Sequence, residues 1–524
     1  MNLEYLKSKF LEDSGFKLYK CPHCGEYYYG FDSNSCGEFP EIPYIFLEED
    51  TKNPSFGLRD FINLFNQYFE SQGHEVIKRY PVVCRWRDDL LLTIASISCF
   101  QPFVTEGLVK APANPLVIHQ PCFRFDDFRE VGYTGRHSIS FTMTAHHAFN
   151  LYWKEELLRY CFEFLTEYLN IPKERIRFKL GYWSGGGNAG ECYEVMVDGL
   201  EVATLVLMHY KEDPNGSIEI KGDKYKEIDN RIIDTGYGAE RFVWMVNKKE
   251  NVFEANYPEI TTVVKSDLKI DKEIEKIYLE GLKSGKIEKE KIEPLADAYR
   301  LIDFTRVILF LCADACVPSN KKEGYLLRLS IRNALSIVYK YRSEMDISKY
   351  IKLMYDWIRE NLDPDMNEEH LNYTLDVIET EKEKFEKIVQ RFESMDLSKI
   401  TKEKAIKLYE SEGFPIFLFK DKLNFNVYDV IDELTKKEIF TKKKKKEEKF
   451  DIPENLPATK KLYYKDPYKF EIEANILYED DDYIILDKTI FYPEGGGQPS
   501  DTGQIGDKKI KSVKKYKDYI LHFK

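Results

Sequence analysis

The chain has 524 residues, of which 43% are hydrophobic and 14% aromatic, and this is enough for several domains with sizeable cores. The sequence contains no run of about 18 apolar residues, and its N-terminus lacks the pattern of a signal peptide, so we expect a cytoplasmic protein without a membrane span. The formal net charge of −13 excludes a protein that coats nucleic acid indiscriminately. A local basic face is compatible with that charge, because binding depends on where the charges lie.

Five segments with different sequence patterns follow one another along the chain. A short cysteine-containing module comes first, and then β-type runs alternate with amphipathic stretches, with helical periodicity at 56–70 and 154–169. A helical region, a charged segment and a second β-type segment follow. We expect an α+β protein with a largely antiparallel sheet flanked by helices. The predicted segments are 1–50, 51–250, 251–440, 441–457 and 458–524.

The charged segment contains five consecutive lysines, Lys442 to Lys446, followed by Glu447-Glu448-Lys449. A solvated linker is the simplest interpretation of this run, and contact with an RNA backbone is the alternative. The β-type segment after it has only about 70 residues, and few domains complete a core at that length without help.

Residues 120–143 predict a hairpin with an arginine on each strand. Gln120-Pro-Cys-Phe-Arg124 leads through a polar loop to Arg136-His137-Ser-Ile-Ser-Phe141-Thr-Met143. Arg124 and Arg136 could straddle a triphosphate, and Phe141 or Met143 offers an apolar surface for a base. The alternative is an exposed hairpin with ordinary surface arginines.

Two further segments contain the residue types of a ligand site. In Asp234-Thr-Gly-Tyr-Gly-Ala-Glu-Arg241, glycines that allow backbone to approach a ligand lie between a carboxylate that could hold an amine and an arginine suited to phosphate. Trp183-Ser-Gly-Gly-Gly offers a similar close-approach backbone. Glu201 enters an apolar strand-like run and is a candidate magnesium ligand, because an acid in that position needs a cationic partner. A solvent-facing start of the strand is the alternative for Glu201.

Taken in chain order, these segments resemble the catalytic motifs of class II aminoacyl-tRNA synthetases, and specifically the alanyl-tRNA synthetases of archaeal type. Gly73 to Pro81 resembles motif 1, Phe123-Arg124 with Tyr133-Thr-Gly-Arg136-His137 resembles motif 2, and Asp234 to Arg241 resembles motif 3. The resemblance covers nearly the whole chain. It implies a six-stranded antiparallel catalytic sheet with helices, an all-α tRNA-recognition domain, and the start of a β-barrel that includes Phe491 to Gly503 and leads to an editing domain.

The resemblance implies a ligase that uses ATP and Mg²⁺ to convert L-alanine to alanyl-adenylate and then transfers alanine to the 3′-terminal adenosine of tRNA(Ala). Arg124 would contact the α-phosphate and the alanine carboxylate, and Asp234 would bind the α-amino group. The implied ATP contacts are Arg124, Arg136, His137, Phe141, Met143 and Arg241, with Arg136 and Arg241 on the distal phosphates. The implied alanine contacts are Trp183, Val206, Asp234 and Gly236, and Glu201 would help to bind Mg²⁺. The residues expected to carry catalysis are Arg124, Arg136, Asp234 and Arg241.

A segment of the helical region, Pro318 to Arg328, resembles the family segment that reads a G·U wobble pair in the tRNA acceptor stem. Asn320 would supply the amide contact in the minor groove, and Arg328 ends the same segment. The alternative for Asn320 is a helix cap beside Ser319. The family's acidic partner in a Leu-Tyr-Asp string is Glu410 here, and this departure leaves its contact with tRNA open.

The N-terminal cysteines Cys21, Cys24 and Cys36 resemble the zinc-binding leader of archaeal relatives. The second cysteine that is expected shortly after Cys36 is missing. Because a structural zinc site needs four ligands, both zinc binding and a metal-free remnant stay open.

The editing centre of the family is expected to be absent from this chain. That centre uses a His-x-x-x-His pair with a cysteine and another histidine, whereas the last cysteine here is Cys316 and only His522 follows His370. A second polypeptide that carries the editing and C-terminal domains, or a truncation, would account for this. Two rival functions are a paralogue that adenylates an amino acid without charging tRNA and a non-catalytic tRNA-binding protein. The intact arginine set disfavours the second rival.

Overall fold

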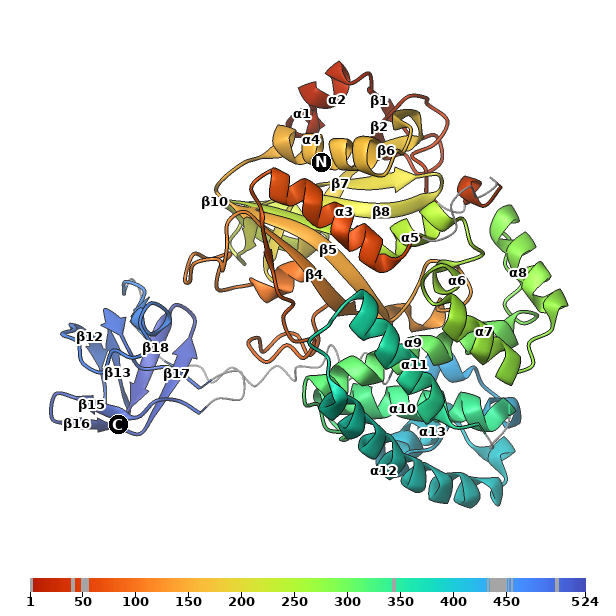
Figure 1. Cartoon of the computed structure of the whole chain (residues 1–524). Coiled ribbons are helices and arrows are strands. Elements are labelled where there is room, and N and C mark those ends of the chain that lie inside the picture. The colour runs from red at the N-terminus through yellow and green to blue at the C-terminus, as the bar shows by residue number, and fades with distance from the viewer. Residues whose placement is uncertain are drawn as a thin grey trace. The chain divides into compact units, whose positions relative to one another are not determined.

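The computed structural model describes residues 3–38, 43–48, 56–341, 345–430, 433, 450, 452–453, 456–494 and 499–524. The chain folds into two compact units (Figure 1). The larger unit contains Met1–Val83, Leu92–Phe100 and Pro112–Phe440, and the smaller one contains Cys84–Leu91, Gln101–Ala111 and Thr441–Lys524. The lysine run Lys442 to Lys446 lies outside the described residues. The five predicted domain boundaries stay predictions.

A large sheet forms the centre of the larger unit. Its described residues make ten strands in the order β1-β2-β6-β7-β8-β10-β5-β4-β3, with β9 beside β10. The strands from β6 to β4 pair antiparallel, which confirms the predicted antiparallel sheet. β3 joins one edge parallel to β4, and β1 and β2 join the other edge, so the sheet is wider than the six strands expected. The strands are β1 (Lys17–Lys20), β2 (Tyr27–Gly30), β3 (Glu75–Ile77), β4 (Leu116–Phe123), β5 (Ser140–Phe149), β6 (Ile176–Gly185), β7 (Asn188–Val197), β8 (Leu200–Glu212), β9 (Ile218–Ile220) and β10 (Asp223–Gly238).

Two-residue turns join the long strands β6, β7 and β8. Gly186 and Gly187 have φ angles of 59° and 82° between β6 and β7, and Asp198 and Gly199 have φ angles of 51° and 87° between β7 and β8. Positive φ at both central residues matches the type I′ turn, whose twist suits an antiparallel hairpin. Two of the three glycines that follow Trp183 are therefore required by a turn.

Helices α3 (Leu58–Ser71), α4 (Lys154–Glu163) and α5 (Ala239–Asn247) pack on the sheet (Figure 1). Aromatic side chains fill the space beneath α3. The ring centre of Phe65 lies 5.1 Å from that of Tyr237 on β10, and the ring centre of Phe69 lies 4.3 Å from that of His146 on β5. Successive residues on a strand point to opposite faces, so the neighbours of His146 and Tyr237 point away from α3. The candidate site lies on that second face.

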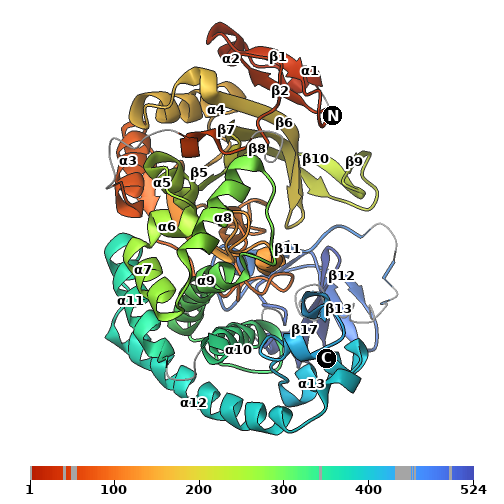
Figure 2. The same cartoon turned by 90° about the vertical axis from the view of Figure 1, so that its right-hand side faces the viewer.

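The helical region packs around α9, whose residues from Leu295 to Cys312 are all buried. A helix that is buried on every side belongs to the core of its unit. α9 contacts α7, α10, α11 and α12, and it also contacts strand β5 (Figure 2). The helices of this region are α6 (Val252–Asn256), α7 (Pro258–Asp267), α8 (Lys272–Ser284), α9 (Glu293–Ala313), α10 (Lys322–Tyr341), α11 (Ile347–Asn361), α12 (Glu368–Glu393) and α13 (Lys402–Glu412). The predicted all-α region is confirmed.

In the smaller unit the described strands form three small sheets. One of them has the order β12-β13-β18-β17, and its core contains Ile484, Leu486, Val513 and Ile520 together with Ile510. The second β-type segment is thus confirmed, and the completion of a barrel stays a prediction. The strands are β11 (Lys460–Lys461), β12 (Ile476–Glu479), β13 (Tyr483–Leu486), β14 (Lys488–Thr489), β15 (Gly503–Ile505), β16 (Lys508–Ile510), β17 (Ser512–Tyr516) and β18 (Tyr519–Phe523). Within the described parts of both units, no helix combines the length and apolar character that crossing a membrane requires.

Candidate active site

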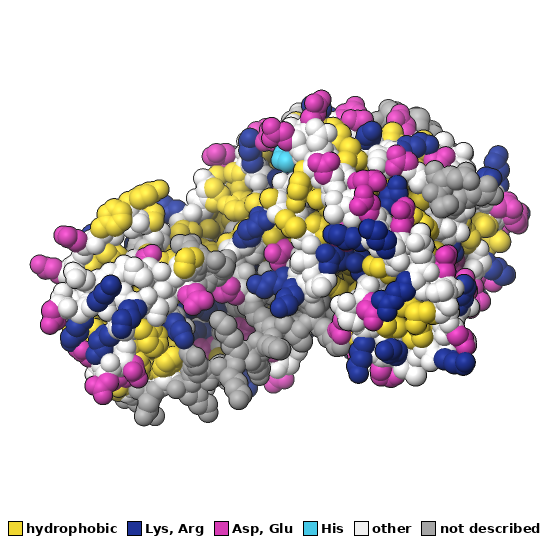
Figure 3. Space-filling view, turned by 90° about the horizontal axis from the view of Figure 1, so that it is seen from below, with side chains coloured by type: hydrophobic (Ala, Val, Ile, Leu, Met, Phe, Trp, Pro, Cys, Tyr) yellow, Lys and Arg dark blue, Asp and Glu magenta, His cyan; other side chains and the backbone are white. Residues whose placement is uncertain are grey.

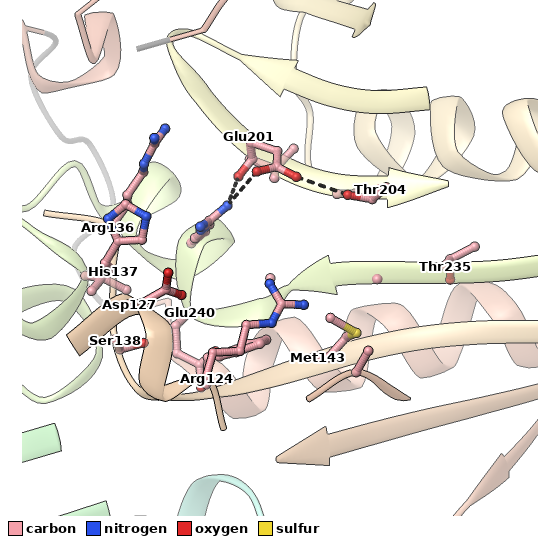
Figure 4. A pocket seen from close by; sticks show the side chains of 18 of the residues that line it. Arg124, Asp127, Arg136, His137, Ser138, Met143, Glu201, Thr204, Thr235 and Glu240 are labelled. Carbon is pink, nitrogen blue, oxygen red and sulfur yellow. Dashed lines mark hydrogen bonds and ion pairs between the residues drawn. The ribbon is translucent and has the colours of Figure 1, made fainter. Parts of the chain in front are cut away.

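A pocket of about 870 Å³, part of it open to solvent, lies over β5, β8 and β10 (Figure 4). Every residue predicted to contact ATP, alanine or magnesium lines the pocket. These residues are Arg124, Arg136, His137, Phe141, Met143, Trp183, Glu201, Val206, Asp234, Gly236 and Arg241. Segments that are far apart in the sequence therefore meet at one place.

Strand register brings the floor of the pocket together. On β8 and β10, Asp234 lies opposite Val206 and Gly236 lies opposite Thr204. A Cβ atom on Gly236 would lie 3.0 Å from Sδ of Met143, which is tighter than nine in ten real Cβ contacts. Any larger residue at position 236 would force Met143 to shift. The glycine therefore leaves space beside Asp234 that a side chain would fill.

Asp234 is a buried acid on the floor of this pocket. Its side chain is 8% exposed, and burial raises its pKa to about 8. Nδ1 of His147, on the neighbouring strand β5, lies 3.6 Å from Oδ1 of Asp234. Burial lowers the pKa of His147 to about 3, so this histidine is neutral and does not neutralise a charged Asp234. A bound cation would favour the ionised form of Asp234.

Arginines from different segments line the same pocket. The guanidinium of Arg124, directly after β4, lies 4.9 Å from the ring centre of Phe141, and its Nε donates to the backbone oxygen of Ile94 at 3.1 Å. Arg241, in the first turn of α5, donates from Nη1 to the backbone oxygen of Glu201 at 2.8 Å. Arg136 comes from the loop between β4 and β5. Permanent, forked positive charges of this kind suit phosphate and carboxylate groups.

Glu201 lies at the start of β8 beside these arginines. Its Oε1 accepts a hydrogen bond from Oγ1 of Thr204 at 3.0 Å, and its Oε2 lies 3.4 Å from Nη1 of Arg241 (Figure 4). Burial opposes the ionisation of Glu201, but the nearby arginines and the Thr204 hydroxyl outweigh it, so its pKa lies below the usual value. An ionised carboxylate that faces the pocket is a suitable oxygen ligand for Mg²⁺.

Helix α9 supports the strand that carries part of the site. Oδ1 of Asp303 accepts a hydrogen bond from the backbone nitrogen of Ser140 at 3.1 Å, at the beginning of β5. Arg306, about one turn later, donates to Oγ1 of Thr142 and to Oε1 of Glu240, both at 2.7 Å. Glu240 directly precedes Arg241. The helical region therefore holds two of the segments from which the pocket is built.

The residues predicted to contact tRNA lie together in a second hollow, on the helical region. Asn320, Arg328 and Glu410 all line this groove, which encloses about 770 Å³ and is largely open to solvent. Nη1 of Arg328 donates a hydrogen bond to Oδ1 of Asn320. Nε of Arg328 donates to Oε2 of Glu381, a buried acid on α12, at 3.2 Å. Glu381 thus orients the arginine that in turn holds Asn320.

Basic side chains predominate in this groove. Arg328, Arg332, Lys384 and Lys387 line it together with the acids Glu410 and Glu412. Groups of lysine and arginine side chains are also visible on the face of the protein shown in Figure 3. A local excess of positive charge on a chain of net charge −13 is what a nucleic-acid contact requires.

Comparison with known proteins identifies the protein family to which this chain belongs. The profile of tRNA synthetases class II (A) matches residues 61–295 and 278–524 of this chain. The chain belongs to this family. The predicted class II fold is thereby confirmed, and archaeal alanine–tRNA ligases at 37–38% identity confirm the resemblance to alanyl-tRNA synthetases of archaeal type.

Curated relatives of this class II synthetase are alanine–tRNA ligases from Archaeoglobus fulgidus, Ignicoccus hospitalis and Methanococcus maripaludis, which are 38%, 37% and 37% identical to it. The matches cover 99%, 100% and 100% of this chain but only 62%, 64% and 63% of those relatives. The chain therefore spans less than two thirds of their length. A solved pyrrolysyl-tRNA synthetase from Desulfitobacterium hafniense matches 38% of this chain at 15% identity with a TM-score of 0.27, which is too low to bear on the fold.

The N-terminal cysteines of this synthetase also meet. The sulfur atoms of Cys21, Cys24 and Cys36 all lie within 4.8 Å of one another. Burial opposes ionisation of Cys21, but backbone N–H groups outweigh it and lower the pKa of its thiol, one of them being the N–H of Cys36 at 3.4 Å. The distance between Sγ of Cys24 and Sγ of Cys36 is 3.8 Å, which matches the about 3.8 Å that separates two thiolates on one tetrahedral zinc ion.

The pocket also contains residues that the sequence did not single out. Asp127 follows Arg124 by three positions, and burial raises its pKa although Arg124 and Arg241 oppose this. Glu240 is adjacent to Arg241, so its place in the site had a signal in the motif itself. The other unpredicted lining residues are Ala95, Ser138, Val202, Ala203, Thr204, Thr235, Gly238 and Val252. Small and apolar residues of this kind have no chemistry that a sequence pattern could indicate.

Proposed function

We propose that this chain acts as an alanine–tRNA ligase, which activates alanine with ATP and then charges tRNA(Ala). The observation that carries the proposal is the meeting of Asp234 with Arg124, Arg136 and Arg241 in one pocket. An acid that can bind an amine, beside arginines that can bind phosphates and a carboxylate, matches the substrates of amino-acid activation. The alanine–tRNA ligases among the relatives support this reaction, and a cytoplasmic location belongs to the same proposal.

The space beside Asp234 supports alanine as the amino acid. Val206 lies opposite Asp234, Trp183 lines the same pocket, and Gly236 leaves room for a small group. Such a pocket rejects glycine or serine only weakly, because a methylene or hydroxyl difference is worth about 1–3 kcal/mol. A separate proofreading activity would remove the errors, and a second polypeptide that carries the editing and C-terminal domains stays a prediction.

In the proposed activation step, a carboxylate oxygen of alanine attacks the α-phosphorus of ATP. The bond from that phosphorus to the bridging β-oxygen breaks, and pyrophosphate leaves. Arg124 binds both the α-phosphate and the carboxylate, Asp234 binds the α-ammonium group, and Arg136 and Arg241 neutralise the leaving pyrophosphate. Positioning and charge neutralisation supply most of the catalysis in such a step, so no protein nucleophile is needed.

Class II synthetases use ATP with Mg²⁺, and the pocket fits the ion. Glu201, which is ionised and faces the arginines, is the residue that would hold it. When bound, Mg²⁺ would neutralise charge on the phosphate oxygens. Glu201 would also keep Arg241 in place through their contact at 3.4 Å.

In the proposed transfer step, a hydroxyl of the terminal adenosine of tRNA attacks the carbonyl carbon of alanyl-adenylate, and AMP leaves. We propose that the groove on the helical region binds the acceptor stem, with Asn320 at the base pair and Arg328 behind it. Lys384 and Lys387 would contact the phosphate backbone. The role of Glu410, which lines the same groove, stays a prediction.

We also propose that Cys21, Cys24 and Cys36 bind zinc. The support is the spacing of their sulfur atoms, which is that of cysteines around one tetrahedral zinc ion. These three residues would fill three of the four positions of a tetrahedral ion. The site would tie the strands β1 and β2 to the segment that follows them.

Two assays in sequence test the proposed function. The first measures exchange of radiolabelled pyrophosphate into ATP with alanine present or absent, and the second measures alanine attachment to tRNA(Ala). The proposal requires activity in both. Exchange without attachment would support the paralogue that only adenylates an amino acid, and no alanine-dependent exchange would contradict the proposal.

A further inference from the structure

His147 lies directly behind the buried acid of the candidate alanine site. On β5, Phe141 and Met143 line the pocket, and alternation along the strand places His147 on the same face. Strands β5 and β10 keep one register on both sides of the site, with Ile233 opposite Ala148 and Tyr237 opposite Thr144. Asp234 and His147 are therefore cross-strand neighbours, and their side chains share a face.

The imidazole of His147 has one ring nitrogen with a partner and one without. Nε2 lies 3.0 Å from Oγ of Ser96, in the short helical turn Ser96–Cys99. Nδ1 is buried, makes no hydrogen bond of standard geometry to the described residues, and lies 3.6 Å from Oδ1 of Asp234. This distance is too long for a hydrogen bond. The backbone of Ile233, directly before Asp234, is another polar group near the ring. A buried polar atom without a hydrogen bond is unfavourable, so its position beside a carboxyl group needs a physical reason.

Ser96 determines which nitrogen of His147 can donate. A neutral imidazole has one N–H group and one acceptor nitrogen. Oγ of Ser96 lies 3.0 Å from Nε2 and 3.5 Å from the backbone oxygen of Thr235, so the shorter contact favours donation of its single proton to Nε2. The proton of the ring is then on Nδ1, which is the nitrogen beside Asp234. The backbone nitrogen of Ser96 also donates to Sδ of Met143 at 3.3 Å, so one residue contacts both His147 and the pocket wall. His146, the neighbour of His147 in sequence, contacts Tyr152 and Phe69 instead.

We propose that His147 is a positioning residue for Asp234: when the α-ammonium group of alanine binds, Nδ1–H of His147 donates to Oδ1 of Asp234 and leaves Oδ2 for the ammonium. The proposal rests on the proposed function. The carboxyl proton of Asp234 passes to solvent as the ammonium takes its place, and the ionised carboxylate is then held from both sides. Closing the gap from 3.6 Å to a hydrogen bond requires a shift of only about 0.6 Å, and hydrogen bonds in ligand-free sites often tighten when the substrate binds.

Such a two-sided contact would fix the direction of the carboxylate and, through it, the orientation of alanine. A rotated carboxylate would still attract the ammonium group but would move the alanine carboxylate away from the α-phosphorus. Displacements of about 1 Å can cost two orders of magnitude in rate. His147 would act through Asp234 and would not touch the substrate.

The first arm of the test compares two substitutions at position 147 in alanine-dependent pyrophosphate exchange. His147→Leu removes the donor, whereas the amide of His147→Asn can replace Nδ1–H. We expect His147→Leu to raise the KM for alanine at least tenfold while the KM for ATP changes less than threefold. His147→Asn should return the KM for alanine to within threefold of the wild type. The matched control is His146→Leu, on the opposite face of β5, which should leave the KM for alanine within threefold.

The second arm follows the pH dependence of the KM for alanine. Asp234 faces His147 from β5 and lies opposite Val206 of β8. The charged groups elsewhere in the pocket are Arg124, Asp127, Arg136, Glu201, Glu240 and Arg241. His147→Leu removes a hydrogen-bond donor to the ionised form of Asp234. The midpoint of the pH dependence of the KM for alanine should therefore move to higher pH by about one unit. A merely structural role of His147 would not move this midpoint.

The outcomes separate the two proposals. An unchanged KM for alanine in His147→Leu, or equal defects in His147→Leu and His147→Asn, would overturn the role of His147 and leave the proposed function intact. A wild-type chain without alanine-dependent exchange would overturn the proposed function and this inference together.

Discussion

Nη1 of Arg306 donates a 2.7 Å hydrogen bond to Oε1 of Glu240, and both side chains are almost completely buried. Arg306 lies in the middle of α9, whereas Glu240 lies in the first turn of α5, directly before Arg241. The same guanidinium donates to Oγ1 of Thr142 on β5. One buried cation thus links the helical region to two segments of the candidate active site.

Arg306→Met should therefore destabilise the larger unit. Breaking a buried ion pair by removing one partner costs about 3–5 kcal/mol, which corresponds to a fall of about 3–6 °C in the thermal midpoint of a unit of this size. Arg159→Met is the matched control, since Arg159 forms a partly exposed pair with Glu163 four residues later. Such pairs contribute at most about 1 kcal/mol, so the thermal midpoint of Arg159→Met should fall by no more than about 1 °C. Equal shifts in the two variants, measured by calorimetry, would contradict the role given to Arg306.

The buried state of Asp234 predicts a pH dependence of alanine binding. Burial raises its pKa to about 8, compared with about 3.9 for an unfolded aspartate. The protonated form of Asp234 therefore adds to the free energy of unfolding at low pH. This contribution is lost as the pH rises from about 4 through about 8. Because the ammonium group needs the ionised form, the KM for alanine should fall about tenfold for each pH unit between about 6 and about 8 and then level off. The same slope in Asp234→Asn would show that another group titrates.

The chemistry of the pocket could be predicted from sequence because its residues occur in short, compact strings. Asp234, Gly236 and Arg241 lie within one motif, and Arg124 and Arg136 flank one loop. Each string has the residue types that phosphate, carboxylate and amine require. All of these side chains line one pocket, while their individual roles stay predictions.

What the sequence could not predict depends on contacts between distant segments. His147 is the second of two adjacent histidines, and only the pairing of β5 with β10 shows which of them lies beside Asp234. Ser96 lies between an alanine and an isoleucine, and only the fold brings it to His147. Glu381 lies among many acids of α12, and only packing shows that it holds Arg328. The edge strands β1 and β2 have four residues each, too few for a clear period-two pattern. The inclusion of Cys84–Leu91 and Gln101–Ala111 in the smaller unit has no local signal either.

The groove on the helical region predicts a variant that separates activation from charging. Asn320→Ala should lower kcat/KM for tRNA(Ala) at least tenfold, because a specific contact to a base edge is worth about 1–3 kcal/mol. Alanine-dependent pyrophosphate exchange should be unchanged, since Asn320 lines the groove and not the pocket. Lys384→Ala should instead weaken tRNA binding. It should also reduce the slope of the logarithm of the binding constant against the logarithm of the salt concentration by about one unit. A parallel loss of exchange in Asn320→Ala would argue that the residue is needed for folding.

The cysteine cluster predicts bound zinc. We expect about one zinc ion per chain by elemental analysis of protein purified without chelator, since three thiols lie within 4.8 Å of one another. Cys36→Ser should lose most of the metal. Cys161→Ala, a buried cysteine outside the cluster, should retain it. Zinc at the level of the blank in the unmodified chain would show that the cluster is metal-free.

The most direct test of the account is alanine-dependent pyrophosphate exchange by the wild type and by Asp234→Asn. The substitution keeps the shape of the side chain but removes the charge that would bind the ammonium group. The account predicts clear alanine-dependent exchange in the wild type and a loss of about 100-fold or more in kcat/KM for alanine in the variant, with tRNA binding unchanged. Exchange in Asp234→Asn within threefold of the wild type would contradict the central claim that this carboxylate holds the amino acid.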